Sequence, residues 1–419
     1  MIDYFKPFLK KIIPERARVF LGQLWLRCSN FLLLTSWRFT RNKYHLLKLK
    51  DNSLFGVNLV GYLRSMNGLG EAARSSMLAL SAANIPFGLL EYFHEASPNQ
   101  EESYLFEDKI TNKFFYTVNL LHVNPPQMPY LWKTFEKKNL ACKYNIGVWY
   151  WEMQNVPRSW LWNYRVLDEI WVASNFVAES VHAKSPVPVI KIPPVIHVEY
   201  EEGVSRAGFF LPKDKFLFLC SFDVHSVQNR KNPEGAIRAF KIAFSSRDSS
   251  VGLVIKINNA KHNKEGVHRL KDELRDYLNC YFIEESYSRK KFNLLLSLVD
   301  AYISLHRSEG FGLVPAEAMY LGKPVVVTNW SGTTDFANQE NSCAVDYQLI
   351  PVGPNNPPYS PDEYWADPDI EQAADYMNKL YSDRIYYNKI SKSAIQTIHN
   401  LYSLQVVSAM VKERLNEVS

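Results

Sequence analysis

Runs of apolar residues alternate with amphipathic stretches along most of the chain, and this rhythm predicts the fold. The apolar run at 53–63 is followed by a glycine-containing loop and by an amphipathic stretch at 71–86 that predicts a helix. The same order of strand and helix recurs after FFYTVNLLHVN, YNIGVWYW and LDEIWVASNF. Because strands that alternate with helices pair in parallel, the pattern predicts a doubly wound α/β sheet.

A proline-dense stretch divides this pattern into two series. Residues 184–200 contain four prolines, which favours a connection between domains. A second series of strands and helices follows, and 352–365 is proline-rich and typical of a loop, before helices predicted at 370–418. We therefore expect two Rossmann-like doubly wound domains, the N-terminal one at 51–198 and the C-terminal one at 199–401.

The first 50 residues have a different composition from the rest of the chain. They contain eleven Lys and Arg but two acidic residues, a charge of +9, so the remainder carries −4 of the overall +5. Aromatic and aliphatic residues accompany these charges, as in MIDYFKPFLKKII, without an uncharged run long enough to cross a membrane. Residues 1–50 are thus predicted to be a basic amphipathic arm on an anionic membrane surface. A helix packed on the protein fits the same pattern, and the sequence leaves the choice open.

The cysteines, the N-terminal sequence and the charge of the body exclude several kinds of site and partner. The five cysteines are widely spaced and form no C-x-x-C pair, which argues against a disulfide framework or a zinc site. No signal peptide is recognisable, so we expect a cytoplasmic protein, peripherally attached to the inner face of the membrane through the arm. A nucleic-acid partner is not expected, because the acidic body shows no basic surface pattern.

The stretch SEGFGLVPAEAM places a carboxylate on each side of a glycine-rich bend. Glu309 and Glu317 follow a predicted strand, and Pro315 suits the first turn of a helix, where we also expect Glu317. Glycines let a ligand approach the backbone, and free N–H groups at a helix start attract phosphate. Carboxylates accept hydrogen bonds from sugar hydroxyls. The bare spacing is also compatible with an ordinary strand–turn–helix junction.

Other strand ends carry further candidate groups. Arg230 and Lys231 precede a helix that Asn232 is expected to cap, so the pair is either a diphosphate clamp or a solvated basic pair. His122 ends a strand, where a lone histidine is more often structural. Glu152 follows an aromatic strand and is a further candidate to polarise an acceptor hydroxyl. The loop GLG lacks the G-x-G-x-x-G spacing of dinucleotide sites.

The run EGFGLVPAEAMYLGKPVVVT resembles the E-x7-E signature of family-four retaining glycosyltransferases. The resemblance extends over roughly residues 55–415 and implies the GT-B fold, in which two Rossmann-like domains face a central cleft. It implies that Glu317 holds the nucleotide ribose, and that Glu309 and the loop behind it hold the sugar and diphosphate. Lys231 fits the lysine of the family, whereas Arg230 departs from the family register of the arginine.

The resemblance completes the set of candidate residues, because it implies that His122 contacts the donor sugar. The expected catalytic residues are Glu309, Lys231, Arg230 and His122, and the expected substrate-binding residues are Gly68, Gly70, Gly310, Phe311, Gly312, Leu313 and Glu317. No metal and no cofactor are expected, because no D-x-D stands at a strand end and cationic side chains can stabilise a leaving diphosphate.

These patterns and the resemblance lead to one functional prediction with two rivals. We expect a retaining hexosyltransferase that moves a sugar from a nucleotide diphosphate sugar to a glycan or lipid-linked acceptor, in bacterial surface polysaccharide assembly (O-antigen, capsule or exopolysaccharide). The last helix, about 402–419, would return to the N-terminal domain. The rivals are a nucleotide-sugar 2-epimerase of the same fold and an inactive, membrane-docked glycan-binding subunit. The sequence leaves the base, the sugar, the linkage, the acceptor and the oligomeric state open.

Overall fold

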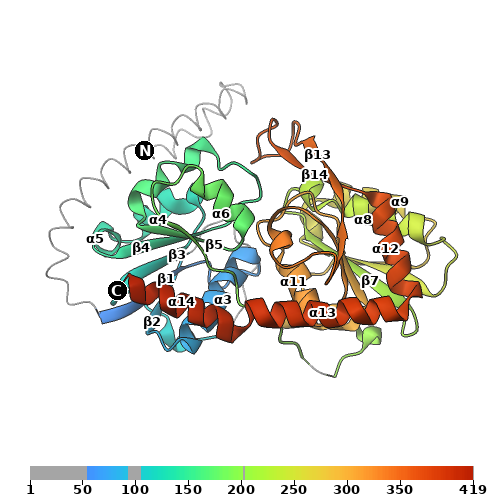
Figure 1. The fold of residues 1–419 in the computed structure, drawn as a ribbon, viewed down its shortest axis with the longest axis horizontal. Coiled ribbons are helices and arrows are strands. Elements are labelled where there is room, and N and C mark those ends of the chain that lie inside the picture. Colours follow the sequence, from blue (N-terminus) through green and yellow to red (C-terminus); the bar gives the residue numbers. More distant parts are fainter. Residues whose placement is uncertain (1–53, 93–104, 202, 419) are drawn as a thin grey trace.

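The structure is a computed structural model, and it describes residues 54–92, 105–201 and 203–418 of the 419-residue chain (Figure 1). It consists of two α/β units that lie next to each other, each built on a six-stranded parallel sheet. The strand orders are β2-β1-β3-β4-β5-β6 and β12-β11-β10-β7-β8-β9. The prediction of two Rossmann-like doubly wound domains is therefore confirmed. The basic arm predicted at 1–50 lies outside the described residues.

The N-terminal sheet alternates strands with helices as the apolar pattern predicts. Its elements are β1 (Leu54–Gly61), α3 (Gly68–Ala82), β2 (Phe87–Glu91), β3 (Tyr116–His122), α4 (Met128–Thr134), α5 (Lys137–Ala141), β4 (Tyr144–Trp149), β5 (Glu169–Val172), α6 (Asn175–His182) and β6 (Val189–Lys191). Part of the predicted connection at 184–200 is thus wrong, because β6 pairs in parallel with β5 and closes this sheet. Three strand residues between two pairs of prolines are enough to form this edge strand.

The second sheet is followed by a hairpin and three helices. Its elements are β7 (Phe216–Asp223), α7 (Gln228–Lys231), α8 (Pro233–Ala243), β8 (Val251–Asn258), α9 (Lys264–Glu273), β9 (Cys280–Ile283), α10 (Arg289–Leu298), β10 (Ala301–Ser304), α11 (Leu313–Tyr320), β11 (Val325–Thr328), β12 (Cys343–Val345), β13 (Tyr347–Pro351), β14 (Tyr364–Pro368), α12 (Ile370–Ser382), α13 (Arg384–Tyr402) and α14 (Leu404–Glu417). The region 352–365 lies mostly in the loop between the antiparallel strands β13 and β14.

Each sheet is buried on both faces because helices cover both. In the N-terminal sheet, Val57 and Leu59 of β1 pack with α3 and α14, whereas Val60 packs with the opposite cluster that contains Trp149. In the C-terminal sheet, α8, α9 and α12 contribute to one cluster, and α10, α11 and α13 contribute to the other. This explains why the strands read as continuous apolar runs, as expected for buried parallel sheets.

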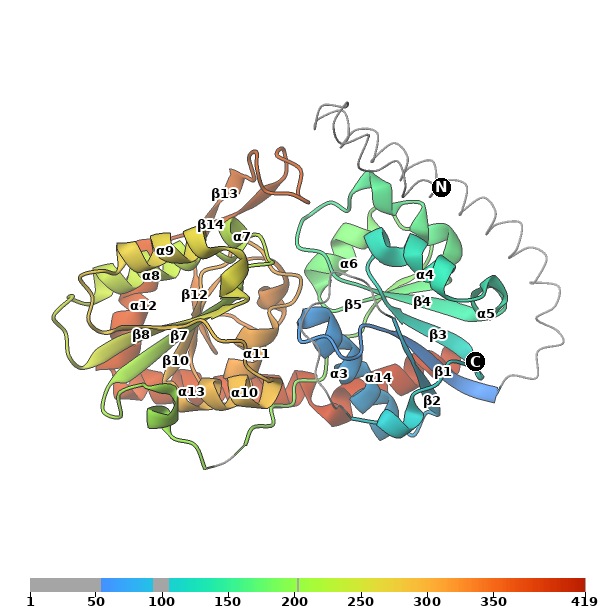
Figure 2. The ribbon, with the colours of Figure 1, turned by 180° about the vertical axis from the view of Figure 1, so that it is seen from behind.

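The chain returns to the N-terminal domain at its end. The long helix α13 runs along the C-terminal domain, and α14 continues to the N-terminal sheet, where it packs against α3 (Figures 1 and 2). Arg414 Nε of α14 lies 3.0 Å from Oε1 of Glu169, a carboxylate of β5 that is completely buried. Two segments therefore connect the domains, one after β6 and one between α13 and α14. None of the helices in the described ranges has the length and apolar character needed to cross a membrane.

Candidate active site

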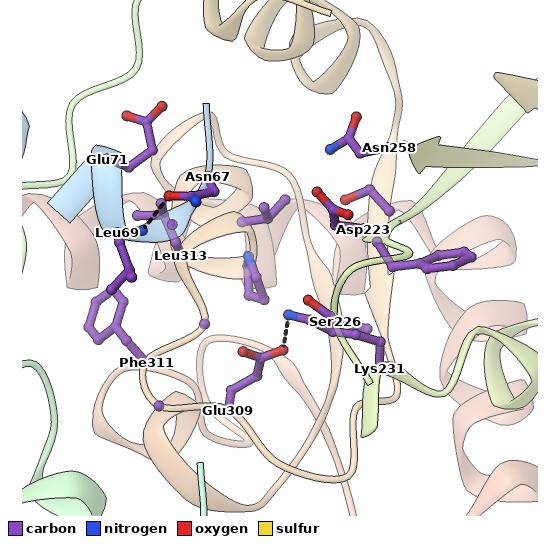
Figure 3. A pocket seen from close by; sticks show the side chains of 18 of the residues that line it. Asn67, Leu69, Glu71, Asp223, Ser226, Lys231, Asn258, Glu309, Phe311 and Leu313 are labelled. Carbon is purple, nitrogen blue, oxygen red and sulfur yellow. Dashed lines mark hydrogen bonds and ion pairs between the residues drawn. The ribbon is translucent and has the colours of Figure 1, made fainter. Parts of the chain in front are cut away.

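A cavity of about 500 Å³ lies between the two domains. Figure 3 shows its N-terminal wall with Asn67, Leu69 and Glu71, opposite Asp223 and Asn258, the last residues of β7 and β8 in the C-terminal domain. The cavity thus collects the carboxyl ends of parallel strands from both sheets, where ligands bind in open α/β folds.

Glu309 is a buried carboxylate of this cavity that two basic side chains contact. Lys231 Nζ lies 2.5 Å from its Oε1, and Arg230 Nη1 lies 3.2 Å from its Oε2 (Figure 3 shows the lysine contact). Burial by itself acts to raise the pKa of Glu309, but the charges of Lys231 and Arg230 outweigh it and lower the pKa to about 2. The carboxylate is therefore ionised at neutral pH and held by two cations.

The basic pair is fixed by the short helix α7 and by the cap that follows it. Asn232 adopts a left-handed conformation (φ 50°), caps α8 by accepting a hydrogen bond from the Gly235 N–H, and is followed by Pro233 at the helix start. Its Nδ2 donates to the carbonyl of Leu305 at 2.8 Å, which ties α8 to the end of β10. The predicted cap at Asn232 is confirmed, and it brings the two basic residues to the bend that carries Glu309.

Glycines shape the bend because neighbouring groups leave no room for a side chain. Gly312 has φ +94°, and a Cβ there would lie 2.4 Å from Cγ2 of Thr333. A Cβ on Gly310 would lie 2.9 Å from the carbonyl of Trp151, which belongs to the N-terminal domain. Both glycines, with Phe311 and Leu313, line the cavity, so the backbone of the predicted phosphate loop faces the ligand space.

Helix α11 begins earlier than the sequence predicts. Leu313 is its first residue after Gly312, and no acidic residue lies in its first turn. Pro315 is the third helical residue, but Glu317 is the fifth, so its predicted place in the first turn is wrong. Gly312 is the N-cap of α11, and its left-handed conformation, which glycine adopts readily, places the helix start two residues before the proline.

Glu317 lies beneath the cavity rather than in its lining. It is 4% exposed and forms an ion pair with Arg289, the first residue of α10, which does line the cavity. Arg289 Nε also lies 3.5 Å from Oε1 of Glu71, so it contacts carboxylates of both domains. Burial acts to raise the pKa of Glu71, but Arg289 and Arg74 lower it overall. The sequence pattern missed Arg289, because only the tertiary fold brings α10 to α11 and α3.

His122 does not join the predicted catalytic group. It ends β3, is 2% exposed, and does not line the cavity. Burial lowers the pKa of His122 to about 3, so the ring is neutral, and its Nε2 has no hydrogen-bond partner in the described part of the chain. A different histidine, His306, lies two residues beyond β10, with Nε2 3.3 Å from Oγ1 of Thr333. Burial lowers the pKa of His306 to about 4, although the nearby charge of Glu309 opposes this.

The two glycines of the first loop differ in position. Gly68 lines the cavity, and a Cβ there would meet no atom within 4 Å. Gly70 lies outside the lining, and a Cβ there would lie 2.0 Å from the carbonyl of Ser65, so this glycine is needed for packing. Asn67 caps α3 by accepting hydrogen bonds from the N–H groups of Leu69 and Gly70, both at 3.1 Å.

Several cavity residues were not singled out from the sequence. Among the polar ones are Asn67, Glu71, Asp223, Ser226, Asn258, Tyr287 and Arg289. Asp223 and Asn258 are register partners at the ends of β7 and β8, so the rule that candidate residues follow parallel strands would have found them. Within the described ranges, no group of three or more His, Cys, Asp or Glu is placed to hold a metal ion.

Comparison with protein families finds a match for the C-terminal part of the chain, which carries one wall of this site. Residues 205–397 match the family model described as Glycosyl transferases group 1. The matched range includes the basic pair, the bend and α11, and the match supports a glycosyltransferase enzyme. The narrower assignment to family four and its E-x7-E signature stays a prediction.

The chain is also similar in sequence to a curated protein and in structure to several solved proteins. Alpha-1,3/1,6-mannosyltransferase ALG2 of Dictyostelium discoideum is 24% identical over 206 residues, which are 46% of this chain and 43% of that protein. The chain therefore matches less than half the length of this relative. The structure of HepE from Anabaena with UDP and glucose has a TM-score of 0.63 at 12% identity, covering 87% of this chain and all of that one. Sucrose-phosphate synthase from Thermosynechococcus elongatus has a TM-score of 0.60 at 14% identity, covering 87% and 99%. These neighbours establish the GT-B fold.

Proposed function

We propose that this chain is a retaining glycosyltransferase that transfers a hexose from a nucleotide diphosphate sugar to a glycan or lipid-linked acceptor. The observation that carries the proposal is the ionised Glu309, held by Lys231 and Arg230 at the start of α11 in a cavity between two Rossmann-like domains. A site with this arrangement offers cations for a diphosphate and a carboxylate for sugar hydroxyls.

The donor would lie along the C-terminal wall of the cavity. The N–H groups at the start of α11 and the ammonium of Lys231 suit the diphosphate, because both stabilise negative charge. Glu309 then faces the sugar hydroxyls. A ribose bound by Glu317, as the resemblance implies, requires Arg289 to move away from that carboxylate, since Arg289 lies between it and the cavity.

The proposed reaction needs no protein nucleophile. The bond between the anomeric carbon and the diphosphate oxygen breaks, and the acceptor oxygen bonds to the same face of the sugar. The acceptor proton passes to the departing diphosphate. Lys231 and the N–H groups of α11 would stabilise the charge that develops on this leaving group. No metal and no cofactor enter this proposal.

The proposals for the acceptor and for the cellular role are based on the N-terminal part of the chain. The wall formed by Asn67, Gly68, Leu69 and Glu152 faces the donor loop and suits an acceptor. The basic arm at 1–50 would hold the enzyme on the inner, cytoplasmic face of a membrane, close to a lipid-linked glycan. These features fit the assembly of bacterial surface polysaccharide.

A panel of donors and acceptors tests the proposed reaction. The protein is incubated with GDP-, UDP- and dTDP-sugars, each with and without lipid-linked acceptors, and the products are separated by mass and their anomeric configuration is read by NMR. Transfer with retention supports the proposal. Epimerised nucleotide sugar without an acceptor would favour the 2-epimerase, and binding without turnover would favour the glycan-binding subunit.

The membrane role has its own experiment. Deletion of residues 1–45 is expected to abolish co-sedimentation with vesicles that contain anionic lipid, while leaving donor binding intact. Vesicle binding that is unchanged after the deletion would contradict the proposed role of the arm.

A further inference from the structure

The β13–β14 hairpin belongs to the C-terminal domain but packs on the N-terminal domain. Figure 2 shows it rising from the C-terminal sheet on the side that faces its neighbour. Tyr359, in the hairpin loop, and Trp365, of β14, belong to the same hydrophobic cluster as Trp151 and Trp160. The ring centroids of Trp151 and Tyr359 are 5.4 Å apart. The hairpin is therefore part of the interface between the domains.

Tyr359 reaches from this interface to a carboxylate of the cavity. Tyr359 is 8% exposed, and its hydroxyl donates a hydrogen bond to Oε2 of Glu152 at 3.1 Å. Burial, together with the charge of Glu152, raises the pKa of Tyr359 far above its ordinary value, so the phenol stays a donor. Glu152 follows β4 of the N-terminal domain and lines the cavity.

The other oxygen of Glu152 faces the basic pair. Arg230 Nη2 lies 3.7 Å from Oε1 of Glu152, while its Nη1 lies 3.2 Å from Oε2 of Glu309. Nη1 of the same guanidinium donates to the carbonyl of Ser308 at 2.8 Å, and Arg230 is 5% exposed. The hydroxyl of Ser308 in turn donates to the backbone carbonyl of Glu152.

These contacts form a chain from Tyr359 through Glu152 and Arg230 to Glu309. Tyr359 and Arg230 belong to the C-terminal domain and hold the same N-terminal carboxylate, each at a different oxygen. Separation of the domains would break both contacts together. Because a buried guanidinium between two carboxylates takes its position from both, a shift of Glu152 also shifts Arg230 relative to Glu309.

We propose that Tyr359 is a positioning residue that fixes Glu152 when the domains are closed, and that Glu152 in turn fixes the guanidinium of Arg230 beside Glu309. This role rests on the proposed glycosyltransferase function and adds the hairpin to the active site. Tyr359 touches no substrate in this scheme, so its removal changes the turnover step more than donor binding.

Two matched variants test the chain of contacts without any substrate. Tyr359→Phe keeps the ring and removes only the hydroxyl, and Tyr364→Phe makes the same change at a half-exposed position of the same hairpin. Hydrogen exchange at residues 306–313 is expected to accelerate about tenfold in the first variant, as for loss of a hydrogen bond to a charged group, and to stay unchanged in the second. Equal exchange in the two variants would overturn the proposal.

A double-mutant cycle tests the route of the effect during turnover. With the donor and acceptor found in the panel, Tyr359→Phe is expected to lower kcat about tenfold and to leave the donor KM within about twofold. The double variant Tyr359→Phe/Glu152→Gln should be no slower than Glu152→Gln alone, because the hydroxyl acts through that carboxylate. Additive losses would refute the route. If no nucleotide sugar of the panel binds, the proposed function fails, and the exchange measurement still decides the contact chain.

Discussion

At the scale of single residues, the site depends on one buried carboxylate whose charge is stabilised by its neighbours. Burial alone would push Glu309 toward its neutral form, yet Lys231 and Arg230 keep its pKa near 2. The sequence was sufficient to nominate these three residues, because each follows a strand in the same parallel sheet. The sequence was not sufficient to nominate Arg289 or to place His122 outside the cavity lining, because both positions depend on how helices and domains pack.

Replacement of Lys231 by methionine tests the cation that contacts Glu309. Removal of a charge-assisted hydrogen bond worth roughly 2–3 kcal/mol should weaken binding of the preferred nucleoside diphosphate about 30- to 160-fold. Isothermal titration calorimetry measures this directly. Lys241→Met, an exposed lysine of α8, is the control and should leave affinity unchanged. Equal affinities in the two variants would contradict the assignment of Lys231 to the donor.

The lowered pKa of Glu309 also predicts how stability depends on pH. A carboxyl with a depressed folded pKa contributes stability above its unfolded pKa, about 4.3, and loses it as the pH falls toward about 2. The free energy of unfolding of Glu309→Gln should therefore lie below that of wild type at pH 7, and the gap should narrow between pH 5 and about 3. Urea unfolding across this range measures it. Glu265→Gln, an exposed carboxylate paired with Arg269, should show a small gap at every pH.

At the scale of elements, the pattern of apolar residues predicted most strands and helices but missed two short strands and misplaced the start of one helix. The strand β6 was read as linker because prolines flank its three residues, and the short β2 was not recognised after the α3 pattern. The start of α11 could not be placed from Pro315, because the left-handed backbone of Gly312 sets it. The residue type alone does not determine which backbone conformation a glycine adopts.

Substitution of Gly312 by alanine tests that helix start. The residue would be held at φ +94° with its Cβ 2.4 Å from Thr333, so the cost should exceed the roughly 1–2 kcal/mol of a left-handed conformation alone. Gly68→Ala is the matched control at the start of α3, where no atom lies within 4 Å and alanine should change stability by less than about 1 kcal/mol. Chemical unfolding measures the free energy of unfolding of both variants. Equal values would show that the bend tolerates a side chain.

At the scale of the whole molecule, the two domains depend on each other through the end of the chain. Helix α14 covers the face of the N-terminal sheet that carries Val57 and Leu59, so this domain is completed by residues more than 340 positions later in the sequence. The two-domain organisation was predictable because the strand–helix rhythm repeats on both sides of the prolines. The interdomain contacts of Glu152 and Tyr359 were not, since nothing local relates a strand end to a distant hairpin.

Leu415 provides the sharpest test of this dependence. It is completely buried in the cluster shared by α14, α3 and β1, so Leu415→Ala should cost about 2–5 kcal/mol through lost burial and the cavity left behind. Hydrogen exchange should show faster opening of β1 and β3, while β7 and β8 of the other domain keep their protection. Leu401→Ala, at a half-exposed position near the end of α13, controls for a general effect of substitution there. Uniform acceleration in both sheets would mean that the domains unfold as one unit, whereas selective opening of the N-terminal sheet would identify α14 as the element that holds it closed.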